Sequence, residues 1–436
     1  SFGVADFIAA EEMGRRRGYW WSPNNDKLLV TSVDESNVLS WHIFKSSDPS
    51  DAPAVIKYPK AGTKNSNVGL EIYSLDGESV PVNWSQSNTW EYLVNVQWTE
   101  PDSIFATVQT RDQKTTGILH VNTSSGAIDE IYRWEDDCWV EIIPGAPKVV
   151  GERVVTIEDH GETRRVVIDG IPCSPKELQI RSLIHCGEDG LLATCSPNPL
   201  DQQICHVTFS GETTLVTRSE GVHEAVANSS LRIIQHRSMD FSGVRTHVYK
   251  NSELIVDIED YSETPNISLN CFFHKAGELD LETVLLLPTD HDGASNLPVL
   301  LDPYGGPHAQ RVRNAQGLYG VSQWFADQGF AVVVTDGRGT PSRSPTFERE
   351  VYGDLATYAL TDQIDALHSI AGKHDFIDLD RVAIRGWSFG GYLAALAVIR
   401  RPDVFHAAVA GAPVTDWSLY DTHYTERYLD NPETKP

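Results

Sequence analysis

The sequence has no long hydrophobic run. Nowhere does it approach the roughly 20 consecutive apolar residues that a membrane-spanning helix needs. Its start also shows no positively charged segment followed by a short apolar core, as a signal peptide would. The printed residues therefore contain no predicted membrane span. A leader or anchor could still precede them, so the compartment stays open, with the cytoplasm only slightly favoured.

Positive charge is scarce. The chain has 35 Lys and Arg residues against 61 Asp and Glu residues, which gives a net charge of −26. Such a surface repels nucleic acid phosphates and anionic lipids, so neither is an expected partner. Acidic runs such as Glu135-Asp136-Asp137 are interpreted as solvated surface.

Cysteine is also sparse, with six residues in 436. There is no Cys-x-x-Cys pair and no His-Glu-x-x-His motif, so the sequence predicts no metal site and no cofactor. Cys195 and Cys205 flank a loop that contains Pro197 and Pro199 and could face each other across a hairpin. We favour buried free thiols over a disulfide there.

A chain of 436 residues is longer than one hydrophobic core usually accommodates, so we expect two domains. Residues 1–262 are rich in short β-type runs separated by turn residues. Several such runs recur together about every 40 to 50 residues, which is the size of one propeller blade. The five segments are Trp20 to Asp34, Glu91 to Asn122, Trp139 to Gly170, Arg181 to Phe209 and Leu231 to Glu259. We predict a β-propeller with four to five blades in this chain; the alternative is a β-sandwich.

Residues 263–436 alternate apolar strands with helices, a pattern typical of an α/β-hydrolase domain. The strands are expected at Val299 to Asp302, Ala331 to Thr335, Val382 to Arg385 and Ala407 to Ala410. Between two of them, Leu360, Ile364, Leu367 and Ile370 recur at helical spacing and predict a crossover helix.

The candidate nucleophile is Ser388, in Gly386-Trp387-Ser388-Phe389-Gly390-Gly391-Tyr392. An apolar strand before and a helix (Leu393 to Arg400) after it are the context of a nucleophile elbow. The backbone N–H of Phe389 would stabilise the developing oxyanion. Tyr304, in the loop Asp302-Pro303-Tyr304-Gly305-Gly306-Pro307, is a candidate second donor. The other interpretations are a serine that fits a tight turn and a tyrosine that packs on one.

Only 48 residues follow Ser388. An α/β-hydrolase needs an acid and then a histidine after its serine, and His406 and His423 come too soon to be that histidine. We expect the chain to be a piece of a larger hydrolase, truncated after the nucleophile helix and inactive by itself.

Four motifs together resemble the dipeptidyl peptidase IV branch of the prolyl oligopeptidase family of serine peptidases. They are Gly386 to Tyr392, the Tyr304 loop, Asp336-Gly337-Arg338-Gly339, and Tyr420-Asp421-Thr422-His423-Tyr424-Thr425-Glu426-Arg427-Tyr428. In the first half, Ala5-Asp6-Phe7 with Glu11-Glu12-Met13, Trp20-Trp21-Ser22-Pro23 and Tyr58 to Gly62 are similar to that family's propeller. The similarity runs nearly end to end, although the first propeller blades would be missing.

The resemblance implies a role for each matching residue. Ser388 is the nucleophile, and Tyr304 helps to hold the oxyanion. Glu11 and Glu12 bind the free α-ammonium of a peptide; by themselves they would be an ordinary surface pair. The implied substrate-binding residues also include an apolar pocket for proline or alanine (Val414, Trp417, Tyr420, Tyr424), Phe389 in place of a tyrosine, and Arg427. The pocket residues could equally be core, and Arg427 could form an ion pair with Glu426 or Asp421.

The implied function is release of dipeptides from free N-termini, with proline or alanine second. Peptides with a free N-terminus are the expected substrates, and a homodimer is the expected state of the whole protein. An endopeptidase or acylaminoacyl peptidase of the same fold, and a non-catalytic propeller scaffold with a vestigial hydrolase domain, are the alternatives.

Overall fold

The computed structural model describes residues 1–84 and 89–435. These residues form two compact units. The first unit comprises residues 1–142, 147–155 and 416–436, and the second comprises residues 143–146 and 156–415. None of the helices in the described residues is both long and apolar enough to span a bilayer.

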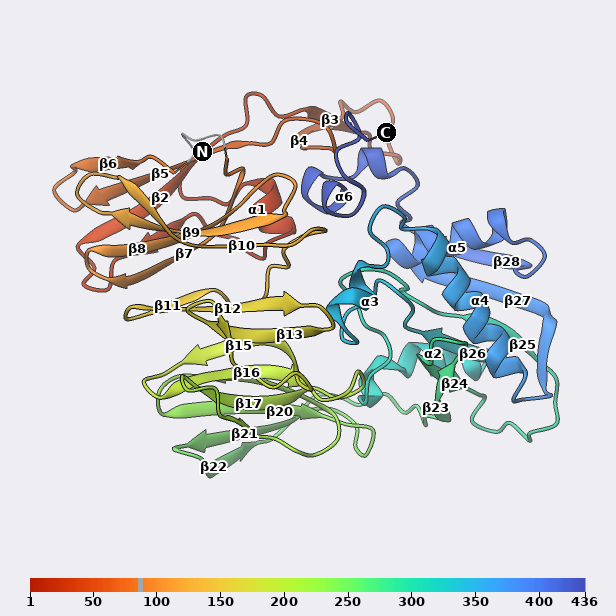
Figure 1. Cartoon of the computed structure of the whole chain (residues 1–436). Coiled ribbons are helices and arrows are strands. Elements are labelled where there is room, and N and C mark those ends of the chain that lie inside the picture. The colour runs from red at the N-terminus through yellow and green to blue at the C-terminus, as the bar shows by residue number, and fades with distance from the viewer. Residues whose placement is uncertain (85–88, 436) are drawn as a thin grey trace. The chain divides into compact units, whose positions relative to one another are not determined.

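Five four-stranded antiparallel sheets follow one another along the chain, coloured red to green in Figure 1. The first contains β1 (Tyr19–Trp21), β2 (Lys27–Asp34), β5 (Asn67–Ser74) and β6 (Ser79–Val82). The second contains β7 (Tyr92–Glu100), β8 (Ser103–Gln109), β9 (Thr115–Asn122) and β10 (Ile128–Glu135). The third contains β11 (Lys148–Val150), β12 (Arg153–His160), β13 (Thr163–Ile168) and β14 (Ile171–Pro172).

The last two sheets have the same construction. The fourth contains β15 (Gln179–Cys186), β16 (Gly190–Ser196), β17 (Gln203–Thr208) and β18 (Thr213–Leu215). The fifth contains β19 (Val222–Ala227), β20 (Leu231–Arg237), β21 (Arg245–Lys250) and β22 (Glu253–Ile258). A separate hairpin of β3 (Ser40–Ile43) and β4 (Ala54–Lys57) is inserted in the first sheet.

These sheets form because apolar residues alternate along the strands. In β2, Leu29, Thr31 and Val33 point inward and their neighbours are more exposed, which is the period of a strand with one buried face. A small sheet cannot cover its own apolar face, so the first two sheets share one core that includes Trp84 and Trp90. Five successive sheets of this kind are propeller blades, as the sequence predicts.

The C-terminal half contains a six-stranded sheet in the order β23-β24-β26-β25-β27-β28. Its strands are β23 (Cys271–Ala276), β24 (Leu281–Leu286), β25 (Leu297–Leu301), β26 (Ala331–Thr335), β27 (Ile377–Trp387) and β28 (Ala407–Gly411). The last four pair in parallel, and the first two are antiparallel additions. This is the predicted α/β fold.

Helices connect and cover these strands. They are α2 (Gly320–Ala326), α3 (Pro345–Arg349), α4 (Thr357–Ala371) and α5 (Phe389–Arg400), with the short 3-10 helix η1 (Gln316–Leu318). The predicted crossover helix is α4, which buries Leu360, Ile364, Leu367 and Ile370. Three further helical segments belong to the first unit: α1 (Phe7–Glu11), η2 (Trp417–Leu419) and α6 (Thr422–Leu429).

The propeller strands end at Ile258 and the mixed sheet begins at Cys271. The compact units do not follow that change of architecture, because residues 416–436 cluster with the first blades. The domain boundary at residue 262 therefore stays a prediction. Cys195 and Cys205 are free and buried in the neighbouring strands β16 and β17.

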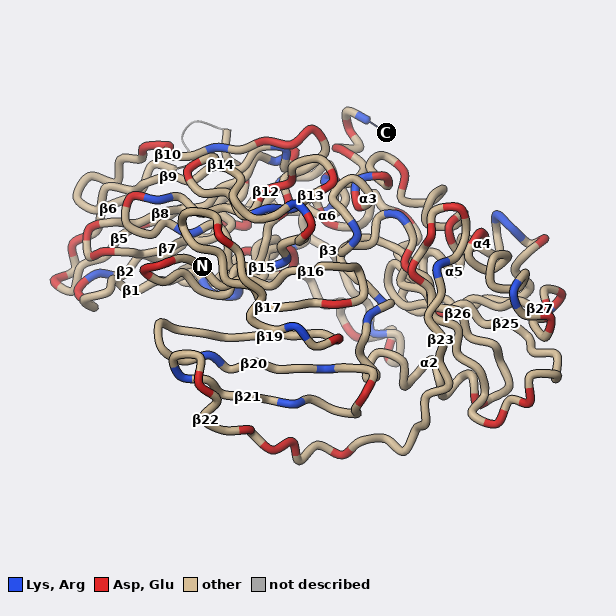
Figure 2. The backbone as a smooth tube through the Cα atoms, turned by 60° about the horizontal axis from the view of Figure 1, so that its bottom comes forward, with Lys and Arg blue, Asp and Glu red and all other residues tan. Residues whose placement is uncertain are grey.

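Acidic and basic residues are interspersed along the backbone of the described residues (Figure 2), and Asp and Glu outnumber Lys and Arg in the sequence. The excess negative charge is thus spread over many loops and strands rather than collected in one tract.

Candidate active site

Ser388 occupies the sharp turn between β27 and α5. Its backbone has φ 56° and ψ −118°, a conformation that non-glycine residues rarely adopt and that costs about 1–3 kcal/mol. The turn is held by a hydrogen bond from Ser388 N–H to the Gly411 carbonyl at 3.0 Å. A half-buried serine at the start of a helix, on a strained turn, has the geometry of a nucleophile elbow.

Three glycines make this turn possible. A Cβ on Gly386 would lie 2.2 Å from the Gly390 backbone, and one on Gly390 would lie 2.7 Å from the Pro303 carbonyl oxygen. A Cβ on Gly391 would lie 2.3 Å from the Gly411 carbonyl oxygen. These contacts are with backbone, which cannot move aside as a flexible side chain can.

Replacing Gly391 by alanine should therefore destabilise the protein. We expect the free energy of unfolding in urea to fall by about 1–3 kcal/mol, the usual cost of overpacking. Gly317→Ala is the matched control, because nothing lies within 4 Å of its added methyl group. Equal stabilities of the two variants would show that the elbow is looser than its contacts indicate.

Tyr304 lies in the loop that leaves β25. Its ring is 5.9 Å from that of Phe389, centroid to centroid. Phe389 is 1 % exposed, and a Cβ on Gly306 would lie 2.4 Å from its ring. The Phe389 side chain thus supports the loop that carries Tyr304, while its backbone N–H is the first of α5. The structure brings Ser388, Tyr304 and Phe389 together within one unit.

The Asp336-Gly337-Arg338-Gly339 loop has a structural role at the end of β26. Asp336 accepts hydrogen bonds from the backbone N–H groups of Arg311 (2.9 Å) and Val312 (2.7 Å). Burial raises the pKa of Asp336 to about 6. Arg338 pairs with Asp362 of α4 at 2.7 Å and stacks on the Tyr358 ring. The loop is therefore fixed to the helix beside it.

Glu11 and Glu12 lie at the C-terminal end of α1. This one-turn helix is capped at its start by Asp6, whose carboxylate accepts from Ala9 N–H and pairs with Arg15 at 3.0 Å. Glu11 is exposed and Glu12 is half-buried. The chain thus presents two consecutive carboxylates from a short, firmly anchored helix.

The aromatic residues predicted for the pocket lie together at the start of α6. The rings of Trp417 and Tyr424 are stacked, 5.6 Å apart with an interplanar angle of 4°. Tyr420 meets the Tyr424 ring edge-on at 5.2 Å. Tyr424 is 7 % exposed, so it is the base of this cluster, while Trp417 and Tyr420 are half-buried. Val414 is half-buried in the other compact unit.

The suggested ion pair of Arg427 with Glu426 or Asp421 is wrong. The Arg427 guanidinium donates to Gln113 Oε1 at 2.7 Å and to Glu141 Oε1 at 3.2 Å. Glu426, one residue earlier and so about 100° around the helix, forms a two-pronged pair with Arg111 at 2.8 Å. All three partners, Gln113, Glu141 and Arg111, come from segments next to strands of the second blade, and sequence spacing cannot reveal such distant contacts.

Asp421 is a residue that the sequence did not single out for this site. It is 0 % exposed and caps α6 by accepting a hydrogen bond from Tyr424 N–H at 2.8 Å. Its carboxyl group interacts directly with that of Glu12. Burial, and then Asp421, raise the pKa of Glu12 well above its usual range. The sequence around Asp421 did contain a recognisable signal, because an Asp three residues before Tyr424 is a candidate N-cap. An N-cap predicts only where a helix begins and does not identify a site residue.

The charge balance at this end of the first unit is negative. In addition to burial, the negative charges of Asp421 and Glu11 raise the pKa of Glu12, and Glu11 also raises that of Asp421. The positive charge of Arg427 lowers the pKa of Glu12. That guanidinium is already bonded to Glu141 and Gln113. A cluster of this composition favours a cationic group.

Both histidines that follow Ser388 in the printed sequence serve structural contacts. His406 accepts a hydrogen bond at Nδ1 from Val382 N–H, 3.1 Å away. His423 is fully buried in the other unit, edge-on to Tyr92 with ring centroids 5.0 Å apart. Neither contact is that of a base directed at Ser388.

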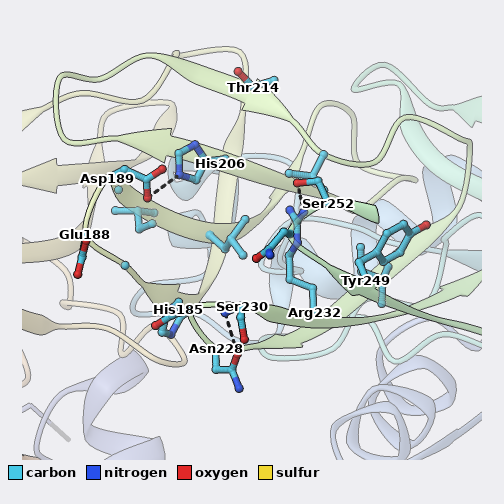
Figure 3. A pocket seen from close by; sticks show the side chains of 18 of the residues that line it. His185, Glu188, Asp189, His206, Thr214, Asn228, Ser230, Arg232, Tyr249 and Ser252 are labelled. Carbon is cyan, nitrogen blue, oxygen red and sulfur yellow. Dashed lines mark hydrogen bonds and ion pairs between the residues drawn. The ribbon is translucent and has the colours of Figure 1, made fainter. Parts of the chain in front are cut away.

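A cavity of about 1020 Å³ lies between the fourth and fifth blades (Figure 3). The hairpins after β15, β19 and β21 line it with polar side chains. In Figure 3, Arg232 reaches Ser252 (2.6 Å) and His206 points to Asp189 (3.9 Å). None of the ten predicted site residues lines this cavity.

The predicted residues divide between the two units. Glu11, Glu12, Trp417, Tyr420, Tyr424 and Arg427 belong to the first unit, and Tyr304, Ser388, Phe389 and Val414 belong to the second. The arrangement in the second unit defines a class: an α/β-hydrolase with a serine on its nucleophile elbow, preceded by propeller blades.

Comparison with known proteins specifies the class further. Residues 318–436 match the prolyl oligopeptidase family, and residues 1–162 match the dipeptidyl peptidase IV N-terminal region. The chain belongs to the dipeptidyl peptidase IV branch of the prolyl oligopeptidase family of serine peptidases.

Among individual relatives, dipeptidyl peptidase 8 of Homo sapiens is 26 % identical and aligns with 99 % of this chain and 60 % of its own length. Probable dipeptidyl peptidase 4 of Aspergillus flavus is 27 % identical, over 98 % of this chain and 61 % of its own length. The crystal structure of Porphyromonas gingivalis dipeptidyl peptidase 4 superimposes with a TM-score of 0.89 at 22 % identity, covering 100 % of this chain and 65 % of that one. The chain thus spans about three fifths of the length of these curated relatives.

Proposed function

We propose that the whole protein is a serine exopeptidase that removes dipeptides from peptides with a free N-terminus, with proline or alanine in the second position. The observation that carries the proposal is the cluster of Glu11, Glu12 and Asp421, whose surplus of carboxyl groups suits an α-ammonium. The relatives named dipeptidyl peptidase support the same activity.

The proposed chemistry is acyl transfer. Ser388 Oγ attacks the carbonyl carbon of the second residue, and a base takes the hydroxyl proton. The Phe389 N–H and the Tyr304 phenol stabilise the oxyanion. The amine of the remaining peptide leaves with a proton, and water then hydrolyses the acyl-enzyme. Trp417, Tyr420, Tyr424 and Val414 would receive the small apolar second residue, and Arg427 would lie near the glutamate pair.

The test compares two substrates on the whole protein. Glycyl-proline anilide with a free amine should be cleaved, and its N-acetylated form should not be, because acetylation removes the charge that the carboxylates bind. Preferential cleavage of the acetylated form would instead indicate an endopeptidase or acylaminoacyl peptidase of the same fold. Failure to cleave either form, together with no reaction with a fluorophosphonate probe, would indicate a non-catalytic scaffold.

We expect no turnover from residues 1–436 alone. The reason is that the two histidines after Ser388 are engaged elsewhere, and a serine without a base retains little rate enhancement. Steady hydrolysis of glycyl-proline anilide by this polypeptide, unaffected by further purification, would contradict this expectation.

We also propose that the whole protein is a homodimer. The β3–β4 hairpin supports this, because it exposes apolar residues that a second copy could cover. They are Ile43 (49 % exposed), Phe44 (69 %), Val55 (58 %) and Ile56 (40 %). The molar mass of the whole protein in solution, measured by light scattering, tests the proposal.

A further inference from the structure

The carboxyl group of Asp421 is in an unusual position for an acid. It is fully buried, and its Oδ2 has no hydrogen-bond partner among the described residues. A buried polar atom without a partner is costly, so such an atom needs an explanation. The carboxyl group of Glu12, the C-cap residue of α1, interacts with this carboxyl at hydrogen-bonding range. Figure 1 labels both α1 and α6, the two helices that carry these residues at their ends.

Two ionised carboxylates cannot hydrogen-bond each other, because both only accept. The contact is satisfied when one of them carries a proton and donates it to the other. Like charges in one buried site push a carboxyl pKa upward for the same reason. Burial raises the pKa of Asp421 as well, but Asp421 also accepts a hydrogen bond from the backbone N–H of Tyr424, which stabilises its ionised form. Glu12 is therefore the partner that holds the proton.

The charged and titratable groups around the pair come from three segments. Glu11 lies on α1 and adds negative charge. Tyr58 precedes the bridge between Lys60 and Asp421, and burial together with the carboxyl groups raises its pKa. Arg427 and Tyr428 lie on α6, and the Arg427 charge lowers the pKa of Glu12. The net effect on Glu12 favours the protonated form.

We propose that Glu12 and Asp421 share one proton in the unliganded site and that an incoming peptide ammonium displaces it. This inference rests on the proposed function, because it assumes that the cluster binds the α-amine. The exchange is balanced: protonated Glu12 and a peptide ammonium give ionised Glu12 paired with that ammonium, and one proton goes to the solvent.

The exchange fixes the pH dependence of binding. An α-amino group has a pKa of about 7.7–8.0, so at pH 6 to 7 the peptide is cationic. In that range binding releases a proton, and the apparent affinity should rise about tenfold for each pH unit. The rise should end where the amine itself deprotonates.

The variant that tests this is Asp421→Asn. Asparagine is also a good N-cap, so its Oδ1 can still accept from Tyr424 N–H and α6 can remain folded. Its amide would donate to an ionised Glu12, which removes the need for the shared proton. Asp416→Asn is the matched control, because Asp416 is an exposed N-cap that accepts from Ser418 N–H at 2.9 Å.

The first measurement needs no peptide. With glutamate carboxyl groups labelled with ¹³C, the Glu12 signal is the one lost in Glu12→Gln. At pH 6.5 it should have the shift of a protonated acid in the unaltered chain and in Asp416→Asn, and that of a carboxylate in Asp421→Asn. An ionised Glu12 in the unaltered chain overturns the inference.

The second measurement is calorimetry with glycyl-prolinamide at pH 6.5 in buffers of different ionisation enthalpy. We expect about one proton released per peptide, reduced nearly to zero in Asp421→Asn and unchanged in Asp416→Asn. Binding without proton release overturns the exchange. No binding, with Glu12 still protonated, contradicts the proposed amine site rather than the shared proton.

Discussion

Replacing Ser388 by alanine in the whole protein should abolish peptide hydrolysis. Loss of the attacking hydroxyl in a serine hydrolase lowers kcat by about 10⁴ to 10⁶, because covalent catalysis is lost while oxyanion stabilisation remains. KM should change little, since the carboxylates and aromatic rings that would bind the peptide are untouched. The measurement is kcat and KM on glycyl-proline anilide, together with labelling by a fluorophosphonate probe.

The control is Ser210→Ala, an exposed serine in the hairpin after β17. It should retain full activity and full labelling. If the Ser388 variant still reacted with the probe, the nucleophile would be another residue and the assignment of the elbow would be wrong.

The second large effect is expected for Glu12→Gln. The substitution removes the charge that would pair with the α-ammonium of the substrate. Loss of one partner of such a desolvated charge pair costs about 2–5 kcal/mol, so kcat/KM for a free-amine substrate should fall roughly 30-fold to several thousand-fold. The change should be far smaller for an N-acetylated substrate, because its neutral end does not pair with the carboxylate. The ratio of kcat/KM for the free-amine substrate to that for the N-acetylated substrate measures how far the variant still prefers a free N-terminus.

Glu78→Gln serves as the control, because Glu78 is an exposed glutamate of the first blade. Equal losses on both substrates in Glu12→Gln would point to a fault in folding rather than in amine recognition. An unchanged ratio of the two rates with full activity would exclude Glu12 from the amine site.

Local patterns predicted much of this structure. The β-rich segments became five blades because alternation along a strand specifies its buried face. The spacing of Leu360, Ile364, Leu367 and Ile370 predicted α4 for the same reason, at the helical period. The elbow was recognisable because the strand, the glycines and the helix are contiguous in the sequence.

Contacts between distant residues were beyond the sequence. Arg427 and Glu141 are 286 residues apart, and Glu426 and Arg111 are 315 apart. Asp421 was considered as part of a motif and as a possible partner of Arg427, but nothing local shows that its carboxyl group interacts with that of Glu12. The β3–β4 hairpin was also missed, since its short strands lack a buried face.

The division of the predicted site residues between two compact units has a consequence for how the protein can evolve. On the proposed assignment, the groups that recognise the amino end of a peptide belong to one compact unit and the nucleophile belongs to the other. Mutations in the unit that carries the nucleophile could then abolish catalysis without removing the groups that bind the amino end of a peptide. On the proposed function, a descendant that lost Ser388 would still bind peptides with a free N-terminus but would no longer cleave them.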